Sequence, residues 1–287
     1  MLVNSKVLLE DAMKHNYAVA GINTTSQTML RAVLEAAEEE GTPVILSHAQ
    51  LHEPYAPIEL MGPLMKAAAE KSTVPCSLHL DHGTTEAYIY KALSLGFTSI
   101  MADFARFSFE ENVVRTKKIA DVCHEIHVTV EGEYGEMPSN VTGQGRALPE
   151  GESLEFFFTK PDKAARYVEQ TGVDSLVVSF GSVHGIYIEE PKMDYERLGA
   201  IREAVSNTPL VMHGGSGLSE EDTRTCIDGG IRKINYYTYM ACEPSKKLVQ
   251  FISSSDKPPY FHEICEYSRE LMKEKARYAI KLFQNRG

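Results

Sequence analysis

The alternation of short apolar segments with longer amphipathic segments constrains the fold of this chain more than any other feature of its sequence. Apolar runs of strand length occur at 17–22, 43–48, 76–80, 98–102, 128–133, 175–179, 210–213 and 233–236. Helical patterns separate these runs at 29–40, 57–70, 86–96, 110–126, 161–172, 195–206 and 220–230. Several of the helical patterns end in glycine, as helices often do. Strands that alternate with helices in this way predict a parallel sheet.

Eight such units predict a closed (β/α)₈ TIM barrel, although periodicity alone leaves an open doubly wound sheet as the alternative. The 287 residues suit one α/β barrel and contain no linker, so we expect a single domain over 1–287. The irregular stretch 136–160 is expected to form a lid over the active site, with a plain surface insertion as the alternative. Residues 258–284 are expected to form one or two C-terminal helices that extend the barrel.

Composition and charge argue against several classes of function. A net charge of −11 without a basic block makes nucleic acid an unsuitable partner. The sequence has no apolar run long enough for a membrane span, and its N-terminal segment lacks the architecture of a signal peptide. Five scattered cysteines without a CxxC pair favour a reducing, cytoplasmic setting. We therefore expect a cytoplasmic protein that acts on a small molecule.

Polar residues and glycines gather where the predicted strands end, which is the catalytic end of a parallel barrel. Three of the ten histidines, His82, His184 and His213, lie at such ends, and a glycine follows each of them. Three neutral imidazoles with an open coordination position make a catalytic zinc site, and they leave the metal's charge available to a substrate oxyanion. The remaining histidines are taken as ordinary surface or core residues: His15, His48, His52, His79, His124, His127 and His262.

Carboxylates accompany these histidines in the sequence. Asp81 directly precedes His82, and a carboxylate at that point is suited to exchange a proton with a substrate hydroxyl. Asp103 and Glu133 end neighbouring predicted strands. We expect this pair to form a second divalent metal position or to orient the histidine ligands, with a barrel-filling or solvated pair as an equal alternative.

A glycine-rich run follows the seventh predicted strand and opens the turn into the next helix. Gly214, Gly215 and Ser216 offer backbone N–H groups and a hydroxyl that can converge on an anion. Barrel enzymes often bind phosphate after strands seven and eight, and the eighth strand adds Asn235 and Thr238. The run therefore predicts a phosphate site, with a tight strand–helix turn as the alternative.

Five segments taken in order resemble the class II, metal-dependent fructose-bisphosphate and tagatose-bisphosphate aldolases: HLDHG (79–83), FEENV (109–113), GSVHG (181–185), HGGSG (213–217) and KIN (233–235). The resemblance spans most of the chain. It implies a (β/α)₈ barrel, a catalytic Zn²⁺, and a homodimer or homotetramer. It also implies a ketose bisphosphate substrate that is cleaved to dihydroxyacetone phosphate and an aldehyde. Fructose 1,6-bisphosphate is the first expectation, and tagatose 1,6-bisphosphate or another ketose phosphate is the alternative.

The same resemblance assigns roles to individual residues. His82, His184 and His213 match the zinc ligands, and Asp81 matches the acid/base at the C4 hydroxyl. Asp103 and Glu133 match the family's alternate metal ligands or orienting carboxylates. The residues that match its phosphate and hydroxyl contacts are Gly185, Gly214, Ser216, Thr238 and, for the hydroxyl, Asn235. A monovalent cation held by the carbonyls of Val183, Gly185 and Gly214 is implied as well.

The chain departs from the family where the family's site faces the distal end of the sugar. The family's lid carries a GG-x-E-D stretch whose acidic residue exchanges the C3 proton, and this stretch is absent here. Glu150 or Glu152, or else Glu136, is the candidate for that role. Arg106 and Arg269 are the candidates for a distal phosphate, with a solvated surface position as an equal alternative. These departures concern the identity of the sugar more than the type of reaction.

Two other functions compete with the metal-dependent aldolase. Lys233 and Asn235 share strand parity, so Lys233 could face the barrel interior as the Schiff-base lysine of a metal-independent aldolase. This reading leaves the three histidines without a purpose. An aldolase-like protein that binds metal and sugar phosphate without catalysis is the other alternative, and a zinc-dependent hydrolase is a weaker third.

Overall fold

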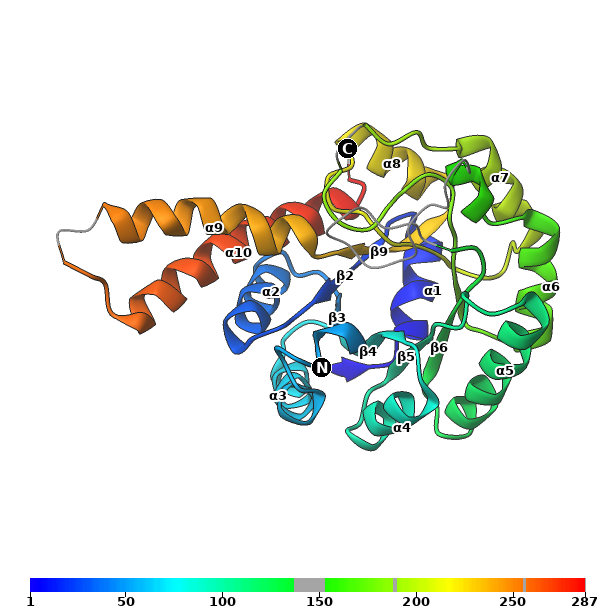
Figure 1. Cartoon of the computed structure of the whole chain (residues 1–287), viewed down its shortest axis with the longest axis horizontal. Coiled ribbons are helices and arrows are strands. Elements are labelled where there is room, and N and C mark those ends of the chain that lie inside the picture. Colours follow the sequence, from blue (N-terminus) through cyan, green and yellow to red (C-terminus); the bar gives the residue numbers. More distant parts are fainter. Residues whose placement is uncertain (137–152, 188–189, 255–256, 287) are drawn as a thin grey trace.

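The computed structural model describes residues 1–136, 153–187, 190–254 and 257–286. The strands of its barrel are β2 (Val19–Asn23), β3 (Val44–Ala49), β4 (Cys76–Gly83), β5 (Ser99–Ala102), β6 (Thr129–Glu133), β7 (Ser175–Val177), β8 (Leu210–Met212) and β9 (Ile231–Tyr236). All of them run parallel in the order β4-β3-β2-β9-β8-β7-β6-β5, and a further β4–β5 pairing closes the ring. The predicted (β/α)₈ barrel is confirmed, and the open sheet is wrong (Figure 1).

The helices that follow the strands form the outer layer of the barrel, as Figure 1 shows. They are α2 (Gln27–Glu39), α3 (Ile58–Lys71), α4 (Glu86–Ser94), α5 (Phe109–Glu125), α6 (Pro161–Thr171), α7 (Tyr195–Ala204) and α8 (Glu220–Asp228). All seven predicted helices are therefore confirmed. Ser26 and Ser219 cap two of them by accepting a backbone N–H, and Gly172 ends α6 with a φ of 70°.

Two further helices, α1 (Ser5–His15) and α9 (Thr238–Ser253), were not predicted, and for α9 the sequence shows a local reason. α1 precedes the barrel and packs Leu8, Leu9 and Ala12 against the amino-terminal ends of the strands. α9 starts directly after β9 without a capping side chain and contains Pro244, so it lacks the usual signals of a helix. Together with β1 (Leu2–Val3), which pairs with β4, α1 covers the end of the barrel opposite the site.

The C-terminal extension is confirmed as α10 (Phe261–Phe283). α10 packs against α9 and α2, and the two C-terminal helices form a hairpin that projects away from the barrel (Figure 1). Val249, Tyr260 and Phe261 on this hairpin are exposed. Within the described residues, no helix combines the length and apolarity that crossing a bilayer requires. The single-domain boundary of 1–287 stays a prediction.

Candidate active site

The carboxyl ends of the barrel strands surround a cavity of about 370 Å³. Its lining comes from residues at or after the carboxyl ends of six of the eight strands: Asn23, Leu51, His52, Asp81, His82, His184, Gly185, Ile186, Gly214, Ser216, Asn235, Tyr237, Thr238, Ala241 and Cys242. The cavity thus lies where the sequence placed the catalytic end of the barrel. It contains ring nitrogens, carboxylate oxygens and amide groups, which is the chemistry of a site for a polar ligand.

His82, His184 and His213 converge at the mouth of the barrel. Their ligand atoms all lie within 4.8 Å of one another, and Nε2 of His82 is 3.0 Å from Nδ1 of His213. His213 is fully buried and His82 is nearly so. Such a trio of imidazoles is the donor set of a zinc site that keeps one position open. The structure therefore brings together the three histidines that the sequence selected.

A bulge in β4 explains how Asp81 and His82, two consecutive residues, both reach the mouth. Successive side chains of a regular strand point to opposite faces. The β4–β5 register, however, shifts between Leu80 and Gly83, and His82 adopts a left-handed φ of 49°. Its backbone N–H donates to the sulfur of Met101 and leaves the regular ladder. A bulge re-aims a side chain in this way, and a left-handed non-glycine residue is a form of strain often found at functional sites.

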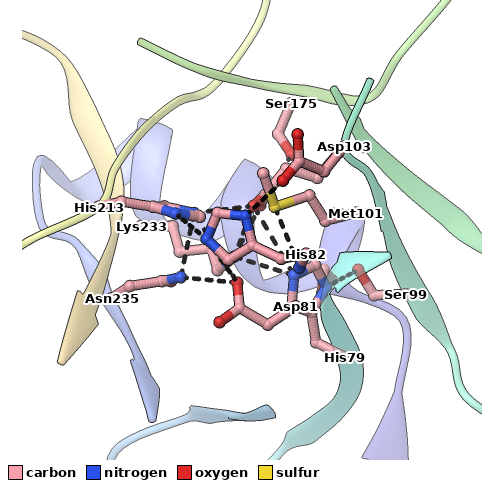
Figure 2. Close-up of polar contacts among 12 residues, drawn as sticks. His79, Asp81, His82, Ser99, Met101, Asp103, Ser175, His213, Lys233 and Asn235 are labelled. Carbon is pink, nitrogen blue, oxygen red and sulfur yellow. Dashed lines mark hydrogen bonds and ion pairs between the residues drawn. The ribbon is translucent and has the colours of Figure 1, made fainter. Parts of the chain in front are cut away.

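A carboxylate lies behind each of two ring nitrogens that face away from the trio. Oδ2 of Asp103 is 2.7 Å from Nδ1 of His82, and Oε1 of Glu131 is 3.4 Å from Nε2 of His213 (Figure 2). The carboxylate of Asp103 fixes Nδ1 as the nitrogen of His82 that carries the proton and leaves Nε2 free for a metal. Nε2 of His213 also lies 3.0 Å from Nδ2 of Asn235, so two groups compete for it. Glu133 joins Asp103 and His82 in a second group whose ligand atoms lie within 4.8 Å. The geometry thus permits both roles expected of Asp103 and Glu133, which are a second divalent metal position and orientation of the histidine ligands.

The electrostatics of the trio favour a cation. Burial alone would lower the pKa of His82, but the carboxylates of Asp81 and Asp103 raise it to about 10. Burial, followed by the charge of Asp103, raises the pKa of Glu133 well above its ordinary value. A carboxylate that cannot easily ionise beside its neighbours signals surplus negative charge. A divalent ion among the imidazoles would neutralise that surplus, so the residues fit a metal.

Asp81 is 2% exposed and is held as an anion by its neighbours. Its two carboxylate oxygens accept hydrogen bonds from Nδ2 of Asn23 at 2.7 Å and from Nδ2 of Asn235 at 3.0 Å. Burial would raise its pKa, but the His82 and His213 rings lower it below the ordinary value. An ionised carboxylate that lines the cavity is suited to accept a proton from a ligand hydroxyl.

A buried ion pair lies beside the trio inside the barrel, and Lys233 faces the interior as its strand parity suggested. Nζ of Lys233 is 2.8 Å and 2.7 Å from the two oxygens of Glu131, and 3.1 Å from Nε2 of His79 (Figure 2). Lys233 and Glu131 are 1% and 2% exposed, and neither lines the cavity. Because the ammonium group is held in this pair, Lys233 is poorly placed to attack a substrate carbonyl, which weighs against the Schiff-base reading.

Gly185, Gly214, Ser216 and Thr238 line the cavity together, as expected for a phosphate site. Gly214 has a φ of 71°, and a Cβ there would lie 2.3 Å from the carbonyl oxygen of Val183, so only glycine fits. Thr238 is the first residue of α9, whose amino-terminal end favours an anion.

Gly215 departs from the prediction because it does not line this cavity. Its backbone N–H donates to the carbonyl of Asn235 instead of pointing toward a ligand. The carbonyl of Gly214 accepts a hydrogen bond from the hydroxyl of Tyr187, which also accepts one from the N–H of Val183. The monovalent cation implied at these carbonyls stays a prediction.

Several predicted residues are not part of the described cavity. Glu150 and Glu152 lie outside the described residues, as does most of the predicted lid. Glu136 is described and does not line the cavity. The guanidinium of Arg106 lies 5.0 Å from the ring of Phe107. Arg269 forms ion pairs with three glutamates: Glu35, Glu266 and Glu270.

Residues that sequence reasoning missed complete the cavity wall. Asn23 ends β2, so the rule that selected the other strand ends would have found it had the strand been extended by one residue. His52 was taken as an ordinary histidine, but it lines the cavity and its ring lies 4.9 Å from that of Tyr237. His52 belongs to the short 3₁₀ helix η1 (Gln50–His52), and no pattern in the sequence predicts its direction.

The closed barrel and its three convergent imidazoles define a barrel protein with a divalent-metal site at the mouth. The family model described as fructose-bisphosphate aldolase class-II matches residues 3–287, and the chain belongs to that family of metal-dependent aldolases. The family predicted from the five motifs is therefore confirmed.

Individual relatives agree with this assignment. The uncharacterized protein YdjI of Escherichia coli K12 is 38% identical over 287 residues, which covers 100% of this chain and 99% of the relative. The crystal structure of the YdjI aldolase from the same organism has a TM-score of 0.86 and 36% identity, over 99% of this chain and 97% of that one. A putative fructose-1,6-bisphosphate aldolase from Coccidioides immitis has a TM-score of 0.85 and 28% identity, over 98% and 96% of the two chains.

Proposed function

We propose that this protein catalyses the reversible, zinc-dependent aldol cleavage of a ketose phosphate to dihydroxyacetone phosphate and an aldehyde. One observation carries the proposal. The ionised carboxylate of Asp81 lies 4.0 Å from ring nitrogens of both His82 and His213. The same cavity is lined by Gly185, Gly214, Ser216 and Thr238, which we call the cradle. A proton acceptor, a metal site and an anion site in one cavity are the parts that aldol cleavage of a phosphorylated ketose requires.

His82 through Nε2, His213 through Nδ1, and His184 would hold the zinc ion. Zinc supplies Lewis-acid stabilisation of the negative charge that develops on the substrate's oxygens. Asp103 would keep Nε2 of His82 directed at that position, because its carboxylate accepts the proton of Nδ1. Asp103 and Glu133, with His82, would also provide a second divalent position.

The other side chains act on the substrate. The phosphate of dihydroxyacetone phosphate would bind at Gly185, Gly214, Ser216 and Thr238, since these residues meet at the amino-terminal end of α9. Asp81 would take the proton from the C4 hydroxyl as the C3–C4 bond breaks. Asn23 and Asn235 hold that carboxylate through its two oxygens, so its position is fixed.

The remaining parts of the proposal come from the sequence and the family. Glu150 or Glu152 would exchange the C3 proton. Fructose 1,6-bisphosphate is the first substrate to test, followed by tagatose 1,6-bisphosphate. A homodimer or homotetramer is proposed because the projecting α9–α10 hairpin exposes apolar side chains, including Val249, that a second copy could cover.

Two measurements on the zinc-loaded protein test the reaction. The first is exchange of the C3 proton of dihydroxyacetone phosphate with deuterated water, which needs no aldehyde, and the second is condensation with a panel of aldehydes. We expect both activities, and we expect a chelator to remove both. Borohydride should trap no adduct, which separates this enzyme from a Schiff-base aldolase. Binding of dihydroxyacetone phosphate without C3 exchange would show a non-catalytic binder and refute the proposal.

The variant Asp81→Ala tests the assigned proton acceptor. Loss of a positioned general base typically slows a reaction by about two to four orders of magnitude. Condensation should fall by that much, whereas C3 exchange and metal content should persist because Asp81 acts at C4. Condensation near the wild-type rate in this variant would remove Asp81 from its role.

A further inference from the structure

The cavity has two ends, and the order of strands around the barrel separates them. The cradle residues Gly185, Gly214 and Ser216 follow β7 and β8. The residues Leu51 and His52 follow β3, on the far side of β2 and β9 from the cradle. A ketose whose phosphate lies in the cradle therefore extends past the metal trio and Asp81 toward η1. The aldehyde half of the substrate would lie against Leu51 and His52.

The described side chains beyond Asp81 at this aldehyde end are neutral. Among the described residues that line the cavity, none is lysine or arginine. His52 is 7% exposed and its ring lies 4.9 Å from that of Tyr237, beside apolar Leu51. Burial lowers the pKa of His52, so its ring is neutral at pH 7. Both arginines that the sequence offered for a distal phosphate, Arg106 and Arg269, make their contacts elsewhere. Against the described part of this wall, a second phosphate dianion would lack a compensating cation, which is costly.

The same wall presents polar atoms that lack a partner. Oδ1 of Asn23 and Nδ1 of His52 are buried and form no hydrogen bond within the described protein. Both residues line the cavity, and Asn23 also binds the carboxylate of Asp81. A buried polar atom without a partner destabilises the protein unless a ligand or water supplies the missing hydrogen bond. Hydroxyl groups of a bound aldehyde are suited to these two polar side chains, because a hydroxyl can donate and accept.

We infer that the aldehyde end of the site takes an uncharged hydroxyaldehyde and that His52 recognises one of its hydroxyl groups. The inference rests on the proposed aldolase function and narrows it to ketoses with a single phosphate, at the end that becomes dihydroxyacetone phosphate. It therefore places a ketose monophosphate ahead of the two bisphosphates named above. The described part of the wall offers no cation to a distal phosphate, while the polar side chains of Asn23 and His52 select for hydroxyls over a plain alkyl chain.

The test compares three acceptors in condensation with dihydroxyacetone phosphate: glyceraldehyde, glyceraldehyde 3-phosphate and propanal. For the wild-type enzyme, kcat/KM for glyceraldehyde should exceed that for each of the other two by about tenfold or more. In His52→Phe, which keeps a ring against Tyr237, the preference for glyceraldehyde over propanal should fall by about tenfold. In His52→Arg, the new cation should shift the preference toward glyceraldehyde 3-phosphate.

Exchange of the C3 proton of dihydroxyacetone phosphate tests the proposed aldolase function separately from the inference about the aldehyde end. Absence of exchange in the wild-type enzyme refutes the aldolase function itself. Exchange together with a wild-type preference for glyceraldehyde 3-phosphate overturns only the inference about the aldehyde end. His262→Phe is the matched control, because His262 is an exposed residue of α10 outside the cavity. An equal change of acceptor preference in His52→Phe and His262→Phe would overturn the role of His52. An acceptor preference that is unchanged in both His52→Phe and His52→Gln would overturn it as well.

Discussion

Lys233→Met is expected to lower the stability of the protein strongly, because it breaks a buried ion pair. The ammonium group contacts both oxygens of Glu131 at 2.8 Å and 2.7 Å, and the two residues are 1% and 2% exposed. Lys233 holds the pKa of Glu131 well below its ordinary value, although burial acts in the opposite direction. Removing the lysine therefore leaves a buried carboxylate that must either stay charged without its partner or bind a proton at neutral pH.

The expected cost is a large part of the stability of a domain. Breaking one side of a buried pair costs about 3–5 kcal/mol, against about 5–15 kcal/mol for the unfolding of a typical domain. Glu131→Gln should cost a similar amount, because it leaves the ammonium of Lys233 unpaired. The double variant Lys233→Met with Glu131→Gln should lose clearly less than the sum of the two, since it leaves no buried charge of this pair.

Urea unfolding of the metal-free protein at pH 7 measures these free energies. The chain contains no tryptophan, so far-ultraviolet circular dichroism is the suitable signal. Lys247→Met is the matched control, because Lys247 pairs with Glu274 at 3.9 Å on the surface, where a pair contributes at most about 1 kcal/mol. The reasoning fails if Lys233→Met and Lys247→Met lower stability equally, or if the losses of the two single variants simply add in the double variant.

Two further predictions concern Asp103 and His48. Asp103→Ala removes the carboxylate 2.7 Å from Nδ1 of His82, and chelator competition should show metal affinity lower by about 10–100-fold; unchanged affinity would contradict the orienting role. His48 is fully buried, and burial lowers its pKa to about 4 from an ordinary 6.5, so the unfolded chain binds a proton that the folded protein does not. The free energy of unfolding should therefore fall by about 3 kcal/mol between pH 6.5 and pH 4 from this group alone. Urea unfolding of His48→Phe should show a smaller fall over the same pH range. An unchanged fall would show that another group is responsible.

Sequence periodicity predicted the barrel and most of the site because both depend on local patterns. The ends of parallel strands meet at one edge, so His82, His184 and His213 could be selected without knowing any distance. The sequence also placed Asp81 beside His82 at the mouth, but it could not predict how two consecutive residues both reach it. Strand alternation puts them on opposite faces, and only the bulge brings them together. The direction of His52 depends in a similar way on a short 3₁₀ turn.

The ionised state of Asp81 depends on several strands together. Burial favours its neutral form, which would be unable to accept a proton from the C4 hydroxyl. The opposing effects come from the His82 ring on β4, from Lys233 on β9, and from the amide hydrogen bonds of Asn23 on β2 and Asn235 on β9. The buried pair of Lys233 thus contributes to the proton acceptor as well as to the barrel interior. Because β2 and β9 are the first and last strands of the barrel and pair with each other, the meeting of the two chain ends of the barrel is itself a condition for a carboxylate that is buried, oriented and charged.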